Sequence, residues 1–183
     1  MKNKVQVMGV MNVTPNSFSD GGKFQKTAAI EKQIESFEKL GVTLLDIGAE
    51  STAPMNQPIS SHEEWQRLGN ILEILLRRKW QGIVSLDSYR PGTAFQFFEA
   101  LKHGGYENKQ FLWNDVSGVW DKEVEGFLNT FEGSRYVFCH NECSGREQTS
   151  HHMEYRIETS NICLLYTSPS PRDRTRSRMP SSA

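Results

Sequence analysis

Ile83-Val-Ser-Leu-Asp87 is a short apolar run that is rich in β-forming residues and ends in a carboxylate. Pro91 follows it, and proline is typical of the first residue of a helix. Apolar residues then recur at helical spacing as far as Leu101, and Gly104 and Gly105 indicate where this helix ends. The stretch therefore predicts one strand with a polar end, followed by one helix.

This strand-and-helix unit repeats along the chain. Other apolar runs with polar ends are Val5–Asn12, Leu44–Asp46, Phe111–Asn114 and Tyr136–His140. Helices are predicted between them at Thr27–Leu40, from Ser61 onward and at Lys122–Thr130. We expect Gly41 to cap the first of these helices in the left-handed conformation, and Ser61 with Glu64 to form a capping box.

Alternating strands and helices predict parallel pairing with right-handed crossovers, since no tight turn joins parallel neighbours. Two architectures remain open on periodicity alone, a doubly wound open sheet and a closed barrel of eight units. A polar residue at every strand end favours the barrel, whose active site gathers side chains from the carboxyl ends of its strands.

Composition limits the function of the 183-residue chain. Its net charge of −1 argues against a dedicated nucleic-acid binder and favours a small-molecule partner. No apolar run approaches the roughly 20 residues of a membrane span, and no secretory signal is recognisable, so we expect a cytoplasmic protein without membrane partners. The three cysteines are too few for a disulfide framework.

The last segment differs in composition from the rest. Leu164–Ala183 is rich in Arg, Ser and Pro and has no apolar period, which indicates a disordered tail. Its sequence also looks like translated adapter or junction sequence, which would place the end of the native reading frame near Ser160. We therefore divide the chain into a barrel domain at 1–160 and a disordered, non-native tail at 161–183.

Four segments resemble the dihydropteroate synthase family in order and spacing. The most specific is Met8–Gly22, MGVMNVTPNSFSDGG, which resembles the first signature of that family. Asp46–Pro54 is similar to the second loop, and Val84–Pro91 and Trp113–Gly118 are similar to the ends of the third and fourth strands. The likeness covers about residues 5 to 155.

The resemblance implies an α/β fold, a partial TIM (β/α)8 barrel with about the first five βα units. It implies a transferase of folate biosynthesis that joins dihydropterin diphosphate to p-aminobenzoate, with Mg²⁺ holding the diphosphate. By the same resemblance Asn12 would meet the Mg²⁺-diphosphate, Asp87 and Asn114 would bind the pterin ring, and Thr52 would lie near substrate in the second loop.

The residue types suit these roles. A carboxylate such as Asp87 accepts hydrogen bonds from the amino-pyrimidine edge of a pterin, and the amide of Asn114 can both donate and accept. Mg²⁺ prefers oxygen ligands and retains water, so one side-chain oxygen from Asn12 beside phosphate oxygens would suffice. We expect Gly48, with Gly21 and Gly22, in loops that approach the ligand.

Other polar residues have plainer interpretations. Asp46 is expected to be structural or to support the binding residues, and Arg90 to lie on a solvated loop. Ala53 stands where the family usually carries Arg, so an anion contact is absent there. Because the later strands of the family have no counterpart, we expect a truncated chain that associates readily and is inactive alone, from a parent that could be a homodimer. A methyltetrahydrofolate methyltransferase and a non-catalytic pterin-binding protein remain alternatives.

Overall fold

The computed structural model describes residues 5–14, 23–51, 57–139, 145–146 and 149. The chain divides into two compact units, Met1–Met153 and Glu154–Ala183, and every described residue belongs to the first. The predicted tail at 161–183 lies outside the described residues.

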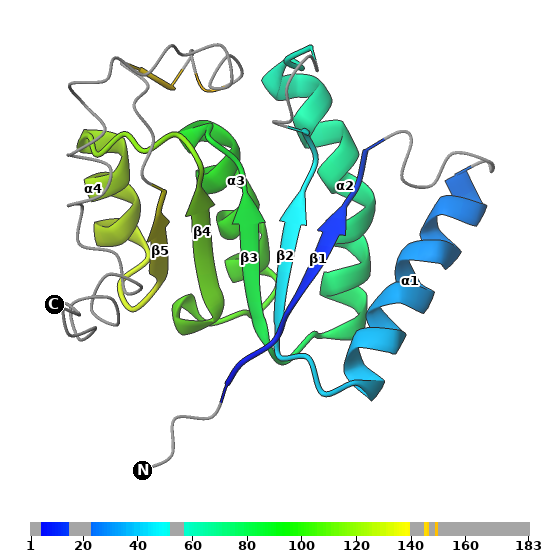
Figure 1. Cartoon of the computed structure of the whole chain (residues 1–183). Helices are drawn as coiled ribbons and strands as arrows, with labels where there is room; N and C mark the ends of the chain where they lie inside the picture. Colours follow the sequence, from blue (N-terminus) through cyan, green and yellow to red (C-terminus); the bar gives the residue numbers. More distant parts are fainter. Residues whose placement is uncertain (1–4, 15–22, 52–56, 140–144, 147–148, 150–183) are drawn as a thin grey trace, which may run out of the picture. The chain divides into compact units, whose positions relative to one another are not determined.

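Strands and helices alternate through this unit (Figure 1). In chain order they are β1 (Met8–Asn12), α1 (Lys23–Lys39), β2 (Leu44–Gly48), α2 (Ser61–Arg78), β3 (Ile83–Asp87), α3 (Pro91–His103), the 3-10 turn η2 (Asn108–Gln110), β4 (Phe111–Asp115), α4 (Lys122–Thr130) and β5 (Arg135–Phe138). The predicted strand at Ile83–Asp87 and the helix at Lys122–Thr130 are confirmed to the residue. The first strand begins at Met8 instead of Val5, and the fifth ends at Phe138, before His140.

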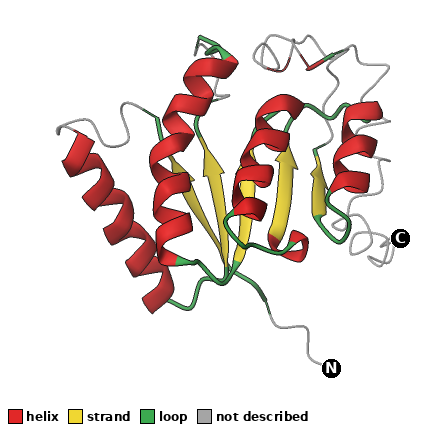
Figure 2. Ribbon diagram, turned by 180° about the vertical axis from the view of Figure 1, so that it is seen from behind, coloured by secondary structure: helices red, strands yellow, loops and turns green. Residues whose placement is uncertain are grey.

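The five strands form one parallel sheet in the order β1-β2-β3-β4-β5. The helices lie on one side of it, as the view from behind shows (Figure 2). A doubly wound sheet would reverse its strand order at a switch point and carry helices on both faces. The sequential order is that of consecutive units of a TIM barrel, so the predicted partial barrel is confirmed and the doubly wound alternative is wrong.

The core lies between the sheet and its helices. Alternate strand residues point into it, among them Met11, Ile47, Leu86 and Trp113, each at most 2% exposed. The helices contribute aromatic rings, with the Phe127 centroid 5.0 Å from that of Trp113 and 5.4 Å from that of Phe98 on α3. Edge-to-face packing of this kind adds to the area that the rings bury.

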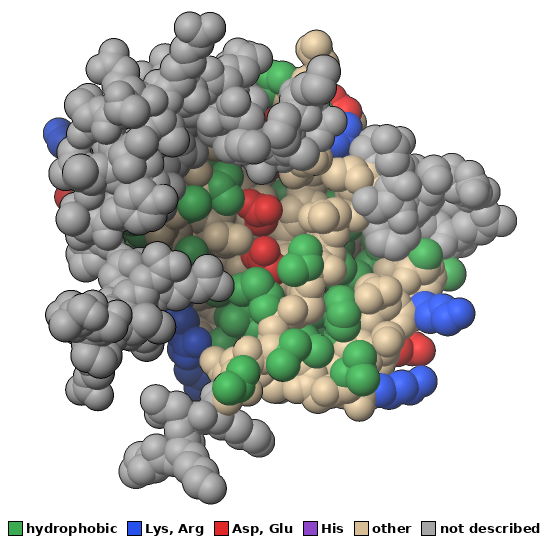
Figure 3. Space-filling model, in the orientation of Figure 1, with side chains coloured by type: hydrophobic (Ala, Val, Ile, Leu, Met, Phe, Trp, Pro, Cys, Tyr) green, Lys and Arg blue, Asp and Glu red, His purple; other side chains and the backbone are tan. Residues whose placement is uncertain are grey.

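The other strand residues form the open face of the sheet, on which acidic side chains lie among hydrophobic ones (Figure 3). Met8 and Val10 on β1 are 39% and 57% exposed, and Val137 on β5 is 37% exposed. Among the described strands, β1 and β5 each pair with only one neighbour. Within that part of the chain, the face that would be the inside of a closed barrel is therefore open along both of its sides.

Two helix ends test the predicted caps. Gly41 has φ +70°, its N–H donates to Glu38 and that of Val42 donates to Phe37, so the left-handed cap of α1 is confirmed. The predicted capping box of α2 is wrong by one residue. Ser60 is the cap, because its hydroxyl accepts from the Glu63 N–H at 3.2 Å, and the Glu64 side chain turns inward instead.

Candidate functional site

Three of the predicted site residues lie in one row across the open face. The register pairs Asn12 with Gly48, Gly48 with Asp87, and Asp87 with Asn114. Paired residues of parallel strands point to the same face, so the row carries its side chains on one side of the sheet. It stands at the carboxyl ends of β1 to β4, where a TIM barrel gathers its active site.

Gly48 sets the spacing of this row. A β-carbon at position 48 would lie 3.2 Å from the Oδ1 of Asn12 and 3.3 Å from the Oδ2 of Asp87. The side chains of these two residues therefore approach each other over the glycine. The expectation that Gly48 lies in a loop is wrong, because it is the last residue of β2 and is buried.

The Asp87 carboxyl is in an unusual electrostatic environment. Burial raises the pKa of Asp87 to about 7, and the negative charges of Asp46, Glu64, Asp115 and Glu50 add to the rise. Such a carboxyl exchanges its proton near neutral pH, and N–H donors of a bound ligand would favour its ionised form. A strongly shifted carboxyl at a strand end is typical of a functional site.

The Asp46 carboxyl holds the Asn114 side chain in place by hydrogen bonds. The Nδ2 of Asn114 lies 3.2 Å from one oxygen of Asp46 and 3.4 Å from the other, and Ser85 Oγ donates to Asp46 at 2.5 Å. Asp46 and Ser85 form the next row down the sheet and are 6% and 0% exposed. The sequence carries a signal for this pair, since both are polar residues two positions before the row in otherwise apolar strands.

Thr52 lies outside the described residues, as do Gly21, Gly22 and Ala53, so their predicted roles stay predictions. The described ends of the second loop are anchored by Arg90. Its guanidinium bonds to Glu50 at 2.5 Å and to Glu64 at 3.2 Å, and it donates to the Ile59 carbonyl at 2.5 Å. The side chain is only 17% exposed, so the prediction of a solvated Arg90 is wrong.

A second buried cluster was not predicted. Arg146 donates to the fully buried Asp115 at 2.5 Å, bonds to Asp121 at 2.9 Å, and stands 5.3 Å from the Trp113 ring. Tyr136 on β5 also donates to Asp115, at 2.8 Å. The hydrogen bond from Arg146 holds the pKa of Asp121 below its ordinary value. No local sequence pattern predicts this cluster, because Arg146 is distant in the chain from both carboxylates.

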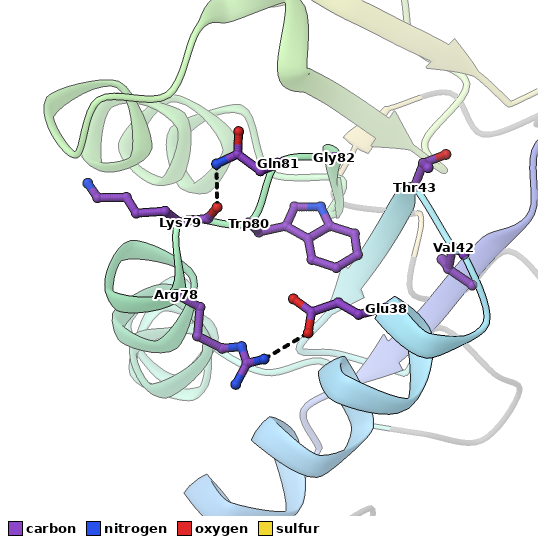
Figure 4. Close-up of a pocket in the computed structure, with 9 residues that line it drawn as sticks. Glu38, Val42, Thr43, Arg78, Lys79, Trp80, Gln81 and Gly82 are labelled. Atoms are coloured by element: carbon purple, nitrogen blue, oxygen red, sulfur yellow. Dashed lines mark hydrogen bonds and ion pairs between the residues drawn. The ribbon is translucent and has the colours of Figure 1, made fainter.

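A cavity of about 460 Å³ lies at the opposite end of the strands (Figure 4). Thr43 and Gly82, the residues before β2 and β3, line it together with Trp80, and Arg78 bonds to Glu38 at its wall at 2.8 Å. The amino ends of barrel strands are associated with stability, and the carboxyl ends with activity. This cavity is therefore separate from the row formed by Asn12, Asp87 and Asn114.

Among the described residues, no group of three or more His, Cys, Asp or Glu side chains could hold a metal ion. Within the same part of the chain, no helix has both the length and the apolar character needed to cross a membrane.

Known proteins resemble the chain in sequence. It is 39% identical over 117 residues to the "Folate synthesis bifunctional protein" of Arabidopsis thaliana, covering 63% of this chain and 22% of the plant protein. It is 32% identical over 146 residues to the dihydropteroate synthase of Staphylococcus haemolyticus, covering 79% of this chain and 51% of the relative. The chain thus spans about half or less of the length of these relatives.

A solved structure agrees with the sequence comparisons. The dihydropteroate synthase of Anaplasma phagocytophilum with bound 6-hydroxymethylpterin-monophosphate superposes with a TM-score of 0.61 at 31% identity. The match covers 75% of this chain and 49% of that one. The family model described as "Pterin binding enzyme" matches residues 8–164, which includes every described element. The chain therefore belongs to the pterin binding enzyme family.

Proposed function

We propose that this chain forms the pterin-binding part of a dihydropteroate synthase. That enzyme would condense 6-hydroxymethyl-7,8-dihydropterin diphosphate with p-aminobenzoate and release diphosphate. The observation that carries the proposal is the single row of Asn12, Asp87 and Asn114 at the carboxyl ends of three strands. The names of the compared relatives support it, as does the pterin compound bound in the Anaplasma structure.

The row offers a pterin complementary groups. Asp87 presents a carboxylate that accepts from the amino-pyrimidine edge, and Asn114 next to it adds an amide at the same height. The reaction breaks a carbon–oxygen bond to diphosphate and forms a carbon–nitrogen bond to the arylamine, which loses a proton. It needs no covalent nucleophile, so the work of these residues is to orient the ring for in-line attack.

Asn12 is the proposed contact for Mg²⁺ with diphosphate. Its side chain is exposed at the rim, with its Oδ1 directed over Gly48 toward Asp87. One neutral oxygen is a weak magnesium ligand alone but suits an ion that keeps waters and phosphate oxygens around it. Bound Mg²⁺ would neutralise charge on the leaving diphosphate, and Asn12 would fix where the diphosphate lies.

The proposed reaction needs groups beyond this row, so we expect the isolated chain to bind a pterin without turnover. Isothermal titration with pteroic acid should give saturable binding, and an assay of diphosphate release should stay at background. Turnover would refute the expected inactivity. The absence of any pteroic acid binding by folded protein would refute the proposed site.

The two alternative functions can each be separated from a synthase. A methyltetrahydrofolate methyltransferase is not favoured, since the relatives compared above carry dihydropteroate synthase or folate synthesis names. A non-catalytic pterin-binding protein would bind pteroic acid as tightly as a synthase does, but its full-length form would give no product. Assaying the parent enzyme separates this alternative from a synthase, because only a synthase forms dihydropteroate.

A further inference from the structure

Asp46 lies directly below the row of candidate ligand residues. It is two residues before Gly48 on β2, so its side chain points to the same face of the sheet. In register it stands between Val10 and Ser85. At 6% exposure it is a buried carboxylate and is placed too deep to lie in the row itself.

The contacts of Asp46 determine how the Asn114 amide is oriented. A carboxyl oxygen without a proton accepts hydrogen bonds, so an amide that faces it turns its NH₂ toward it. The observed Nδ2 distances of 3.2 and 3.4 Å agree with this, and they turn the Oδ1 of Asn114 away from Asp46. Ser85, on the neighbouring strand, also donates a hydrogen bond to Asp46.

We propose that Asp46 is a positioning residue for ligand recognition, because it locks the Asn114 amide so that its carbonyl oxygen is presented beside the Asp87 carboxylate. Asn114 and Asp87 then offer two neighbouring acceptors, and this pair selects ligands that present N–H donors to both. This inference rests on the proposed pterin site and adds to it a residue that sets donor-versus-acceptor specificity without touching the ligand.

Asp46→Asn is the sharpest change to test this. The new amide has nearly the same size, but when its oxygen accepts from Ser85 its NH₂ faces Asn114, which favours the reversed orientation of the Asn114 amide. Pteroic acid binding should weaken by about tenfold, the usual effect of losing one hydrogen bond in a buried site. The matched control is Glu99→Gln, the same kind of change on an exposed part of α3, which should leave affinity unchanged.

A double-mutant cycle separates positioning from a general structural role. In an Asn114→Ala background Asp46→Asn should change affinity less than twofold, because no amide remains to be oriented. An equal loss in both backgrounds would show that Asp46 only supports the sheet and would overturn the proposal. So would an unchanged affinity of the single Asp46→Asn variant.

A measurement without ligand distinguishes this inference from the proposed function. In wild-type protein the side-chain NH₂ of Asn114 should exchange with water more slowly than that of Asn129, which is exposed on α4. The protection should be lost in Asp46→Asn and kept in Glu99→Gln. Slow exchange in a protein that does not bind pteroic acid would support the contact between Asp46 and Asn114 and would refute the pterin site. Fast exchange of Asn114 in wild type would overturn the positioning role, whether or not the variant folds.

Discussion

Asn12 and Asp87 reach toward each other across Gly48, whose missing side chain leaves room for both. The three residues come from three successive strands and meet only because the parallel register places them at the same height. The space above Gly48 is therefore part of the candidate site, although glycine itself contributes no functional group.

Gly48→Ala should block this space. The added methyl group would lie 3.2 to 3.3 Å from the two side-chain oxygens, which would have to move aside. We expect pteroic acid affinity to fall by about tenfold with a loss of stability of about 1 kcal/mol.

The control is Gly69→Ala in α2, where a β-carbon would meet nothing within 4 Å. That variant should gain about 0.5–1 kcal/mol and keep its affinity. Equal affinity of Gly48→Ala and wild type in a titration would refute the role given to Gly48.

The raised pKa of Asp87 predicts how stability depends on pH. The folded chain holds the proton up to about pH 7, whereas the unfolded chain releases it near 3.8. Between these values the folded state binds more protons, so this group lowers the free energy of unfolding as pH rises from about 4 to 7. The acidic groups whose charges add to this rise are Asp46, Glu64, Asp115 and Glu50.

Because those other groups also titrate, the measurement is a difference. Denaturant unfolding of wild type and Asp87→Asn across pH 4 to 8 should show the variant gaining relative stability up to about pH 7 and levelling off above it. A difference that stays constant with pH would contradict the raised pKa of Asp87.

Arg146 should be important for stability. Its side chain is 13% exposed, and its guanidinium neutralises Asp115, which is fully buried. Arg146→Met leaves that carboxylate without its cation, and removing one partner of a buried pair costs about 3–5 kcal/mol. The matched control is Arg77→Met, since Arg77 is 55% exposed and pairs with Glu31 on the surface. Exposed pairs contribute about 0–1 kcal/mol. Chemical denaturation of both variants checks this, and similar losses would contradict the account of the cluster.

The sequence predicted the repeated unit because each strand has its own local signal, an apolar run that ends in a polar residue. Asp87 and Asn114 could be placed in a site because parallel strands bring their carboxyl ends to one edge. The position of Gly48 could not be predicted, since loops and strand ends both use glycine. Whether it lies in a strand depends on pairing with Asn12 and Asp87.

Long-range ion pairs were the least predictable feature. Arg90 follows a strand end and has the sequence context of a surface loop, yet Glu50 and Glu64 from two other elements surround it. Glu64 was expected to cap its own helix, but it turns inward, where it also accepts from the Thr93 hydroxyl at 2.7 Å. The local sequence pattern predicts the helix that carries Glu64, but it does not indicate which neighbouring element the Glu64 side chain contacts.

Titration of pteroic acid into the chain and its Asp87→Asn and Asn114→Ala variants tests the central claim most directly. If the row binds the pterin edge, both variants should bind at least about tenfold more weakly than wild type. Glu99→Gln should bind as wild type does. Wild-type affinity in folded Asp87→Asn and Asn114→Ala would mean that the ligand lies elsewhere, and the proposed site would be wrong.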